Sequence, residues 1–132
     1  MILLDTHAWI WHLADPGRLS ARALKAIEER TSSRGAVLVS SISTWELAML
    51  VERGRLKLSI DAEAWIAHAE ALPFLRFVPV DNRIALASVR LPLSVSPDPA
   101  DRIIVATAML AGIPLVTADK RIRRCGVVKT IW

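Results

Sequence analysis

The chain has 132 residues, which is enough for one domain with a hydrophobic core and too few for two ordinary domains. Its composition is 53% hydrophobic, and 17 basic residues against 13 acidic ones give a formal charge of +4. This charge favours polyanionic partners without establishing one. Cys125 is the only cysteine, which excludes an internal disulfide and a thiolate metal cluster.

Nothing in the sequence predicts a membrane segment or export. The longest uncharged stretch, Ile103–Ala118, is interrupted by Gly112 and Pro114 and is shorter than the about 20 apolar residues of a membrane-spanning helix. Asp5 places a carboxylate where a signal peptide keeps its apolar segment. We therefore expect a cytoplasmic protein that forms a single domain over residues 1–132, with no membrane partner.

Short apolar runs alternate with segments of helical period along the chain. In chain order, the sequence predicts a strand over 2–4, helices over 6–14 and 21–30, a strand over 36–39, helices over 43–52 and 61–72, a strand over 77–80, helices over 81–90 and 99–111, a strand over 114–117, a helical turn from 119, and a strand over 127–131. Ser20, Asp61 and Asp81 are the expected helix caps, while Ser43 and Glu46 have the spacing of a capping box.

Strands separated by helices predict parallel pairing with right-handed crossovers. The expected fold class is therefore α/β, a three-layer α/β/α sandwich with a central parallel sheet. Such sheets bind ligands beyond the carboxyl ends of their strands. Residues that directly follow the predicted strands are thus the first candidates for a functional site.

Four acidic residues are expected at this carboxyl edge. Asp5 directly follows the first strand, and Asp119 follows the strand over 114–117 after one intervening residue, while Glu46 and Asp101 are predicted in the first turns of helices that leave the same edge. Each acid alone fits a helix cap, because helix N-termini favour carboxylates. Together they would repel one another, and a hard cation such as Mg²⁺ or Mn²⁺ relieves that repulsion. These cations also assist phosphodiester cleavage.

Two other classes of protein fit the sequence less well. A phosphohydrolase with an aspartyl nucleophile requires a second Asp two residues after Asp5, where the chain has His7. A phosphoacceptor receiver domain requires paired acids after its first strand and a Thr and a Lys after separate strands. Here Asp5 stands alone, and Thr117 and Lys120 follow the same strand.

The chain resembles PIN domains, and specifically the VapC-like toxins, over essentially its whole length. Four blocks carry the resemblance in the family's order: Leu3-Leu4-Asp5-Thr6-His7, Ser41-Ile42-Ser43-Thr44-Trp45-Glu46-Leu47, Asp98-Pro99-Ala100-Asp101-Arg102-Ile103-Ile104-Val105-Ala106-Thr107-Ala108 and Leu115-Val116-Thr117-Ala118-Asp119. In the subgroup with the Asp-Pro-x-Asp-Arg block a basic residue often precedes that block, whereas this chain has Ser96-Pro97 there.

The resemblance implies a PIN fold and a metal-dependent endoribonuclease that uses Mg²⁺ or Mn²⁺ to activate the attacking water. By position, Asp5 and Asp101 would be the principal metal ligands, Glu46 and Asp119 would complete the acidic pocket, and Asp98 would be an additional acid. The implied partners are an RNA substrate, a cognate antitoxin protein and a second copy of the chain in a homodimer. A catalytically silent PIN domain that binds RNA or protein is the alternative, and a DNA substrate stays open.

Several neighbours of these acids are candidates for supporting roles. Thr6 and Thr117 are placed to hydrogen-bond a carboxylate that binds metal or a water molecule, and Arg102 to pair with a carboxylate or contact RNA. Lys120 begins a basic run that fits RNA phosphates nearly as well as a solvated helix face. His7 is expected to be a surface or cap residue. The rest of the basic run is Arg121, Arg123 and Arg124, and a second basic cluster of unknown use is Arg53, Arg55 and Lys57.

Overall fold

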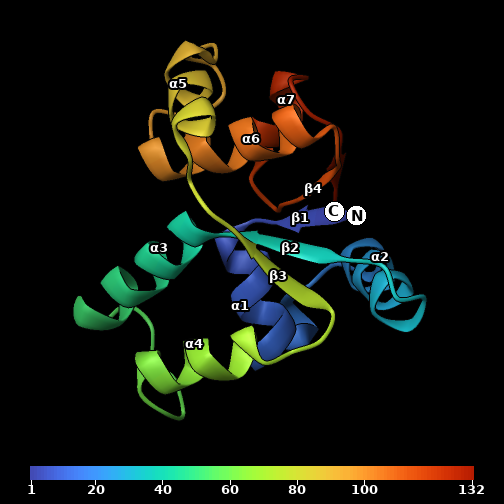
Figure 1. The fold of residues 1–132 in the computed structure, drawn as a ribbon, viewed down its shortest axis with the longest axis vertical. Helices are drawn as coiled ribbons and strands as arrows, with labels where there is room; N and C mark the ends of the chain where they lie inside the picture. Colours follow the sequence, from blue (N-terminus) through green and yellow to red (C-terminus); the bar gives the residue numbers. More distant parts are fainter.

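A five-stranded sheet with the strand order β3-β2-β1-β4-β5 forms the centre of the molecule (Figure 1). The computed structural model describes all residues from 1 to 132. The strands are β1 (Ile2–Leu4), β2 (Val37–Ser40), β3 (Leu75–Val78), β4 (Leu115–Val116) and β5 (Thr130–Ile131). Every neighbouring pair is parallel, which confirms the predicted parallel sheet.

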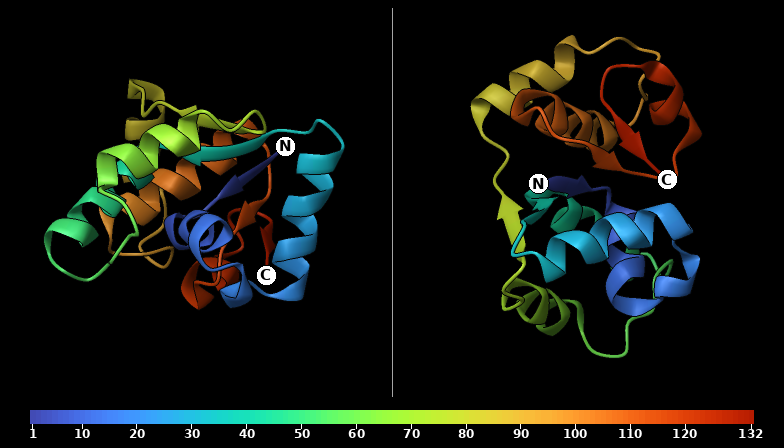
Figure 2. Two further views of the ribbon diagram at one scale, coloured as in Figure 1. Left: turned by 90° about the horizontal axis from the view of Figure 1, so that it is seen from below. Right: turned by 90° about the vertical axis from the view of Figure 1, so that its right-hand side faces the viewer.

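Seven α-helices and one 3₁₀ turn connect the strands. They are α1 (Thr6–Ala14), η1 (Pro16–Arg18), α2 (Ala21–Ser32), α3 (Ser41–Glu52), α4 (Ala62–Glu70), α5 (Asn82–Arg90), α6 (Pro99–Ala111) and α7 (Lys120–Cys125). Helices α1, α2 and α4 lie on one side of the sheet and α5, α6 and α7 on the other, so the fold has three layers (Figures 1 and 2). No helix has the length and apolar character that crossing a membrane requires.

The central strand β1 contributes side chains to both hydrophobic cores. Ile2 and Leu4 belong to the core under α1, α2 and α4, and Leu3 belongs to the core under α5, α6 and α7. All three are fully buried, and each such side chain stabilises the fold by about 1.5–3 kcal/mol. A strand covered on both faces has no polar side, which is why residues 2–4 form a continuous apolar run.

Two strands differ from their predicted bounds by two residues or more, while the other three differ by at most one residue at either end. The strand predicted over 77–80 is β3, which lies two residues earlier because Leu75 pairs with Val37. Pro79 lacks the N–H that a longer ladder would need. The last strand is shorter than the predicted 127–131, since only Thr130 and Ile131 pair with β4.

Candidate metal centre

Asp5 connects β1 to α1 at the carboxyl edge of the sheet. It is the N-cap of α1, where its Oδ1 accepts a hydrogen bond of 2.8 Å from the backbone N–H of Thr6. Its Oδ2 accepts a 2.7 Å hydrogen bond from the hydroxyl of Thr117, which follows β4. The residue is only 3% exposed. The side chain of Asp5 therefore caps α1 and also accepts the hydrogen bond that the sequence predicts from Thr117 to a carboxylate.

Glu46 lies in the second turn of α3, so the predicted capping box is wrong. The helix begins at Ser41, and its cap is Ser40, whose hydroxyl accepts a hydrogen bond from the N–H of Ile42. Ser43 is thereby turned into the molecule, within 2.8 Å of the Thr6 hydroxyl. Thr6 donates to Glu46 Oε1 at 2.6 Å, and since a hydroxyl has one proton, Ser43 must donate to Thr6. Glu46 is thus held by a relay from α1 and not by its own helix terminus.

Asp98 and Asp101 are placed by the first turn of α6. Asp98 is the N-cap, as its Asp-Pro sequence predicts, and its Oδ1 accepts a 2.8 Å hydrogen bond from Ala100 N. Asp101 accepts a 2.9 Å hydrogen bond from the hydroxyl of Ser96, which itself accepts one from Asp98 N. Ser96 thus positions both acids. The sequence analysis did not assign this role to it, and the only sequence signal for it is that Ser96 lies two residues before Asp98.

Three of these carboxylates gather into one group, which we call the acidic centre: Glu46, Asp98 and Asp101. One carboxylate oxygen from each lies within 4.8 Å of those of the other two. Burial, and then the charge of Asp5, raise the pKa of Asp101 to about 7. Burial also raises the pKa of Glu46, to which the charges of Asp5 and Asp98 add, although the hydrogen bond from Thr6 opposes the shift. The four carboxylates therefore repel one another in a partly desolvated space.

This arrangement fits a hard divalent cation. The donors are carboxylate oxygens only, the ligand type that Mg²⁺ and Mn²⁺ prefer. No Lys or Arg forms an ion pair with any of the four acids. The acidic centre therefore has the oxygen donors and the unneutralised negative charge that a divalent cation requires.

Asp119 lies at the same edge but outside this group. It is the N-cap of α7, and its Oδ1 accepts hydrogen bonds from the N–H groups of Arg121 and Ile122 at 2.8 and 3.1 Å. Its own N–H donates to the Thr117 hydroxyl, so one side chain joins Asp119 to Asp5. Asp119 is not among the charges that raise the pKa of Asp101 or Glu46.

His7 has a structural connection that the sequence did not predict. Its Nε2 accepts a 3.0 Å hydrogen bond from the N–H of Ala118, so the proton of the neutral ring is on Nδ1. That Nδ1 lies 3.6 Å from Asp5 Oδ2. His7 therefore joins the start of α1 to the segment after β4, beside the buried carboxylate.

Arg102 pairs with no carboxylate, so the prediction that it forms an ion pair with one is wrong. Its guanidinium instead donates to backbone carbonyls of the segment between α5 and α6 and of the end of α5: Ser88, Val89, Leu91, Pro92 and Ser96. The side chain fixes this segment, which contains Ser96, and so acts on Asp101 through Ser96. Lys120 is exposed at the start of α7.

Residues 2–128 match the family model described as the PIN domain. The chain therefore belongs to the PIN-domain family, as its fold and the acids at its carboxyl edge indicate. It is 40% identical to the ribonuclease VapC22 of Mycobacterium tuberculosis over 122 residues, which cover 92% of this chain and 89% of that protein.

Solved structures show the same fold. The crystal structure of VapBC2 from Rickettsia felis, bound to a promoter DNA fragment, matches with a TM-score of 0.72 and 15% identity over 98% of this chain and 97% of that one. FitAcB from Neisseria gonorrhoeae matches with a TM-score of 0.69 and 22% identity, over 98% of this chain and 96% of that one. These similarities confirm the predicted fold class.

Proposed function

We propose that this protein is a metal-dependent endoribonuclease that acts in the cytoplasm as the toxin of a toxin–antitoxin pair. The observation that carries the proposal is the gathering of Glu46, Asp98 and Asp101 within 4.8 Å, with buried Asp5 beside them. The ribonuclease relative of 40% identity supports the same activity.

The metal would be held by the acidic centre together with Asp5, and Asp119 would lie at its margin. Mg²⁺ or Mn²⁺ bound there would supply activation of the attacking water and neutralisation of phosphate charge. Asp5 is held ready for this role by its hydrogen bonds from Thr6 and Thr117.

Hydroxyl groups orient the remaining carboxylates. Thr6 fixes Glu46, and Ser96 fixes Asp101, so each acid keeps one oxygen engaged by the protein. Oxygens positioned in this way do not have to be ordered when substrate binds, which lowers the free energy needed to assemble the reactive geometry.

Two protein partners belong to the proposal. A cognate antitoxin is supported by a solved toxin–antitoxin complex from Klebsiella pneumoniae, which matches the fold with a TM-score of 0.64. A homodimer is supported by apolar side chains exposed on and just after α5, namely Leu86, Val89 and Leu93. Light scattering of the purified chain tests the dimer, and we expect a mass twice that of one chain.

Cleavage of total cellular RNA by the purified chain tests the activity. We expect cutting with Mg²⁺ or Mn²⁺, none with EDTA, and a loss of at least about 100-fold in Asp5→Asn, because the buried ligand loses its charge. Asp61→Asn is the matched control, since Asp61 is an exposed cap of α4 and Asn caps equally well. A single-stranded DNA of matched sequence tests the sugar preference. A folded wild-type chain that cuts no RNA would support the silent, RNA- or protein-binding alternative.

A further inference from the structure

A basic hollow lies between α2, α7 and the C-terminal strand. It has a volume of about 420 Å³ and is lined by Arg22, Lys120, Arg123, Arg124, Thr130 and Trp132. No acidic residue lines it. Arg30 with Glu29 is the only pairing of a Lys or Arg side chain with a carboxylate, so the four cations of the hollow have no carboxylate partner. They also donate no side-chain hydrogen bond within the protein, in contrast to Arg102, whose donors are used by carbonyl groups.

The basic hollow adjoins the proposed metal centre. The ring of Trp132 has its centroid 6.0 Å from that of His7, and His7 Nδ1 is 3.6 Å from the carboxylate of Asp5. On the other side, Lys120 directly follows Asp119. The N–H of Asp119 donates to the hydroxyl of Thr117, and that hydroxyl donates to Asp5. A polyanion reaching the acids is repelled by them until a cation is bound, whereas the hollow attracts it.

Aromatic rings lie between the hollow and Asp5. The rings of His7, Trp11 and Trp132 form a cluster with centroid separations of 4.9 and 6.0 Å, and the Arg18 guanidinium carbon lies 4.4 Å from the centroid of Trp11. Trp132 is only partly buried and faces the hollow. Cationic grooves with aromatic side chains are the common solution for binding unpaired nucleotides, whose bases stack on the rings while the phosphates contact the cations.

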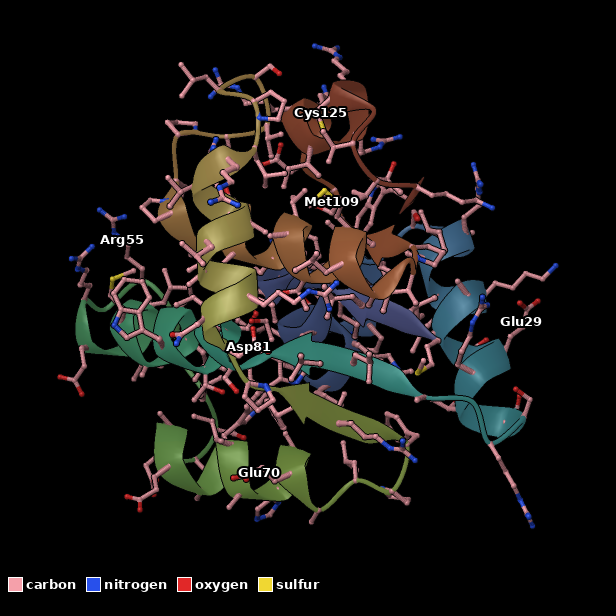
Figure 3. The ribbon with its side chains drawn as sticks, turned by 45° about the horizontal axis from the view of Figure 1, so that its top comes forward. Glu29, Arg55, Glu70, Asp81, Met109 and Cys125 are labelled. Atoms are coloured by element: carbon pink, nitrogen blue, oxygen red, sulfur yellow. The ribbon has the colours of Figure 1, made fainter.

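We propose that the basic hollow binds the phosphates of a single-stranded segment of the substrate RNA next to the cleaved bond, and that Trp132 stacks on one of its bases. This inference rests on the proposed function, since it places the substrate strand of that reaction. The exposed cluster Arg53, Arg55 and Lys57 does not line the hollow. Arg55 lies beyond the outer end of α3, on the opposite side of the molecule from α2 and its Glu29 (Figure 3).

Binding of a labelled single-stranded RNA of mixed sequence, measured with the full chain in EDTA, tests the proposal without requiring cleavage. Arg123→Ala with Arg124→Ala should raise the Kd at least about 10-fold and make the salt dependence shallower by about 1.4, or about 0.7 per lost phosphate contact. Trp132→Ala should raise the Kd about 5- to 100-fold, and Trp132→Phe should recover most of the affinity. The control, Arg53→Ala with Arg55→Ala, removes the same charge and should leave the Kd within about 2-fold.

The thermal midpoint and its increase with Mn²⁺ should be unchanged in the Arg123/Arg124 variant, because neither arginine side chain pairs with an acid. Equal losses in that variant and its control would overturn the proposal, since they would reflect net charge alone. A decaglutamate peptide that binds the wild type more tightly than the RNA, and is lost in the Arg123/Arg124 variant, would also overturn it by assigning the hollow to acidic protein segments. The wild-type chain could bind RNA without ever cutting it, while the hollow variants lose that binding. This result would refute the ribonuclease activity and support RNA binding by the hollow.

Discussion

The pKa of Asp101 shows how the gathered carboxylates affect the stability of the fold. Its pKa of about 7 lies above the value of 3.8 for a free Asp side chain, because burial and the charge of Asp5 disfavour its ionised form. The folded state therefore binds more protons than the unfolded state between these two pH values, and the free energy of unfolding falls as the pH rises through them. Above pH 7 the ionised side chain destabilises the metal-free fold.

Asp101→Asn should consequently stabilise the metal-free protein at pH 8 and leave it unchanged at pH 4. We expect about 1–2 kcal/mol, well below the roughly 4 kcal/mol of the full pKa shift, because solvent partly screens the carboxylate. Urea unfolding in EDTA at the two pH values measures this, with Asp61→Asn as the control. A variant less stable than wild type at pH 8 would show that the hydrogen bond from Ser96 outweighs the repulsion.

The hydroxyl of Thr6 orients Glu46, because it accepts a hydrogen bond from Ser43 and donates one to Glu46. Thr6→Val keeps the shape and removes the relay, so we expect RNA cleavage and Mn²⁺ affinity to fall about 10- to 100-fold. Thr107→Val is the matched control, because Thr107 is equally buried and its hydroxyl bonds only to the carbonyl of Ile103 within α6. Equal activity of the two variants would show that the Thr6 hydroxyl does not support the acidic centre.

Among the elements, α6 was predictable and the start of α3 was not. Asp98-Pro99 is a local signal whose two residues both favour a helix start, and the structure has that start. At α3 the Ser-x-x-Glu spacing matched a capping box at Ser43, but β2 ends at Ser40 and the helix begins immediately. The contact of Ser43 with Thr6 spans 37 residues, and no local pattern carries that information.

The segment between α5 and α6 depends on Arg102 in a way that can be measured. Arg102→Lys keeps the charge but loses the forked donor geometry, so we expect a loss of about 1–3 kcal/mol in unfolding free energy and weaker cleavage through displacement of Ser96. Arg90→Lys, at an exposed position at the end of α5, is the control. Unfolding curves that are superimposable for the two variants would argue against this role.

For the whole molecule, the sequence predicted the parallel sheet and the edge on which the acids lie, because each acid follows a strand or opens a helix. The sequence left open which of the acids would gather. Asp98, expected as an additional acid, lies with Glu46 and Asp101, whereas Asp119, expected in the pocket, caps its own helix, since side-chain direction depends on packing. Three cations of the basic hollow, Lys120, Arg123 and Arg124, belong to the basic run that the sequence shows after Asp119. Arg22 and Trp132 join the hollow only because α2 and β5 are neighbours in the fold.

We infer that the acidic centre and Asp5 form one site for a divalent cation. The thermal unfolding midpoint, measured as a function of Mn²⁺ concentration, reports binding at that site without requiring RNA cleavage. We predict a saturable rise in the midpoint for the wild type and for Asp61→Asn, and none for Asp101→Asn, because a ligand that binds only the native state stabilises it. A wild-type midpoint that stays constant up to millimolar Mn²⁺ would contradict the claim.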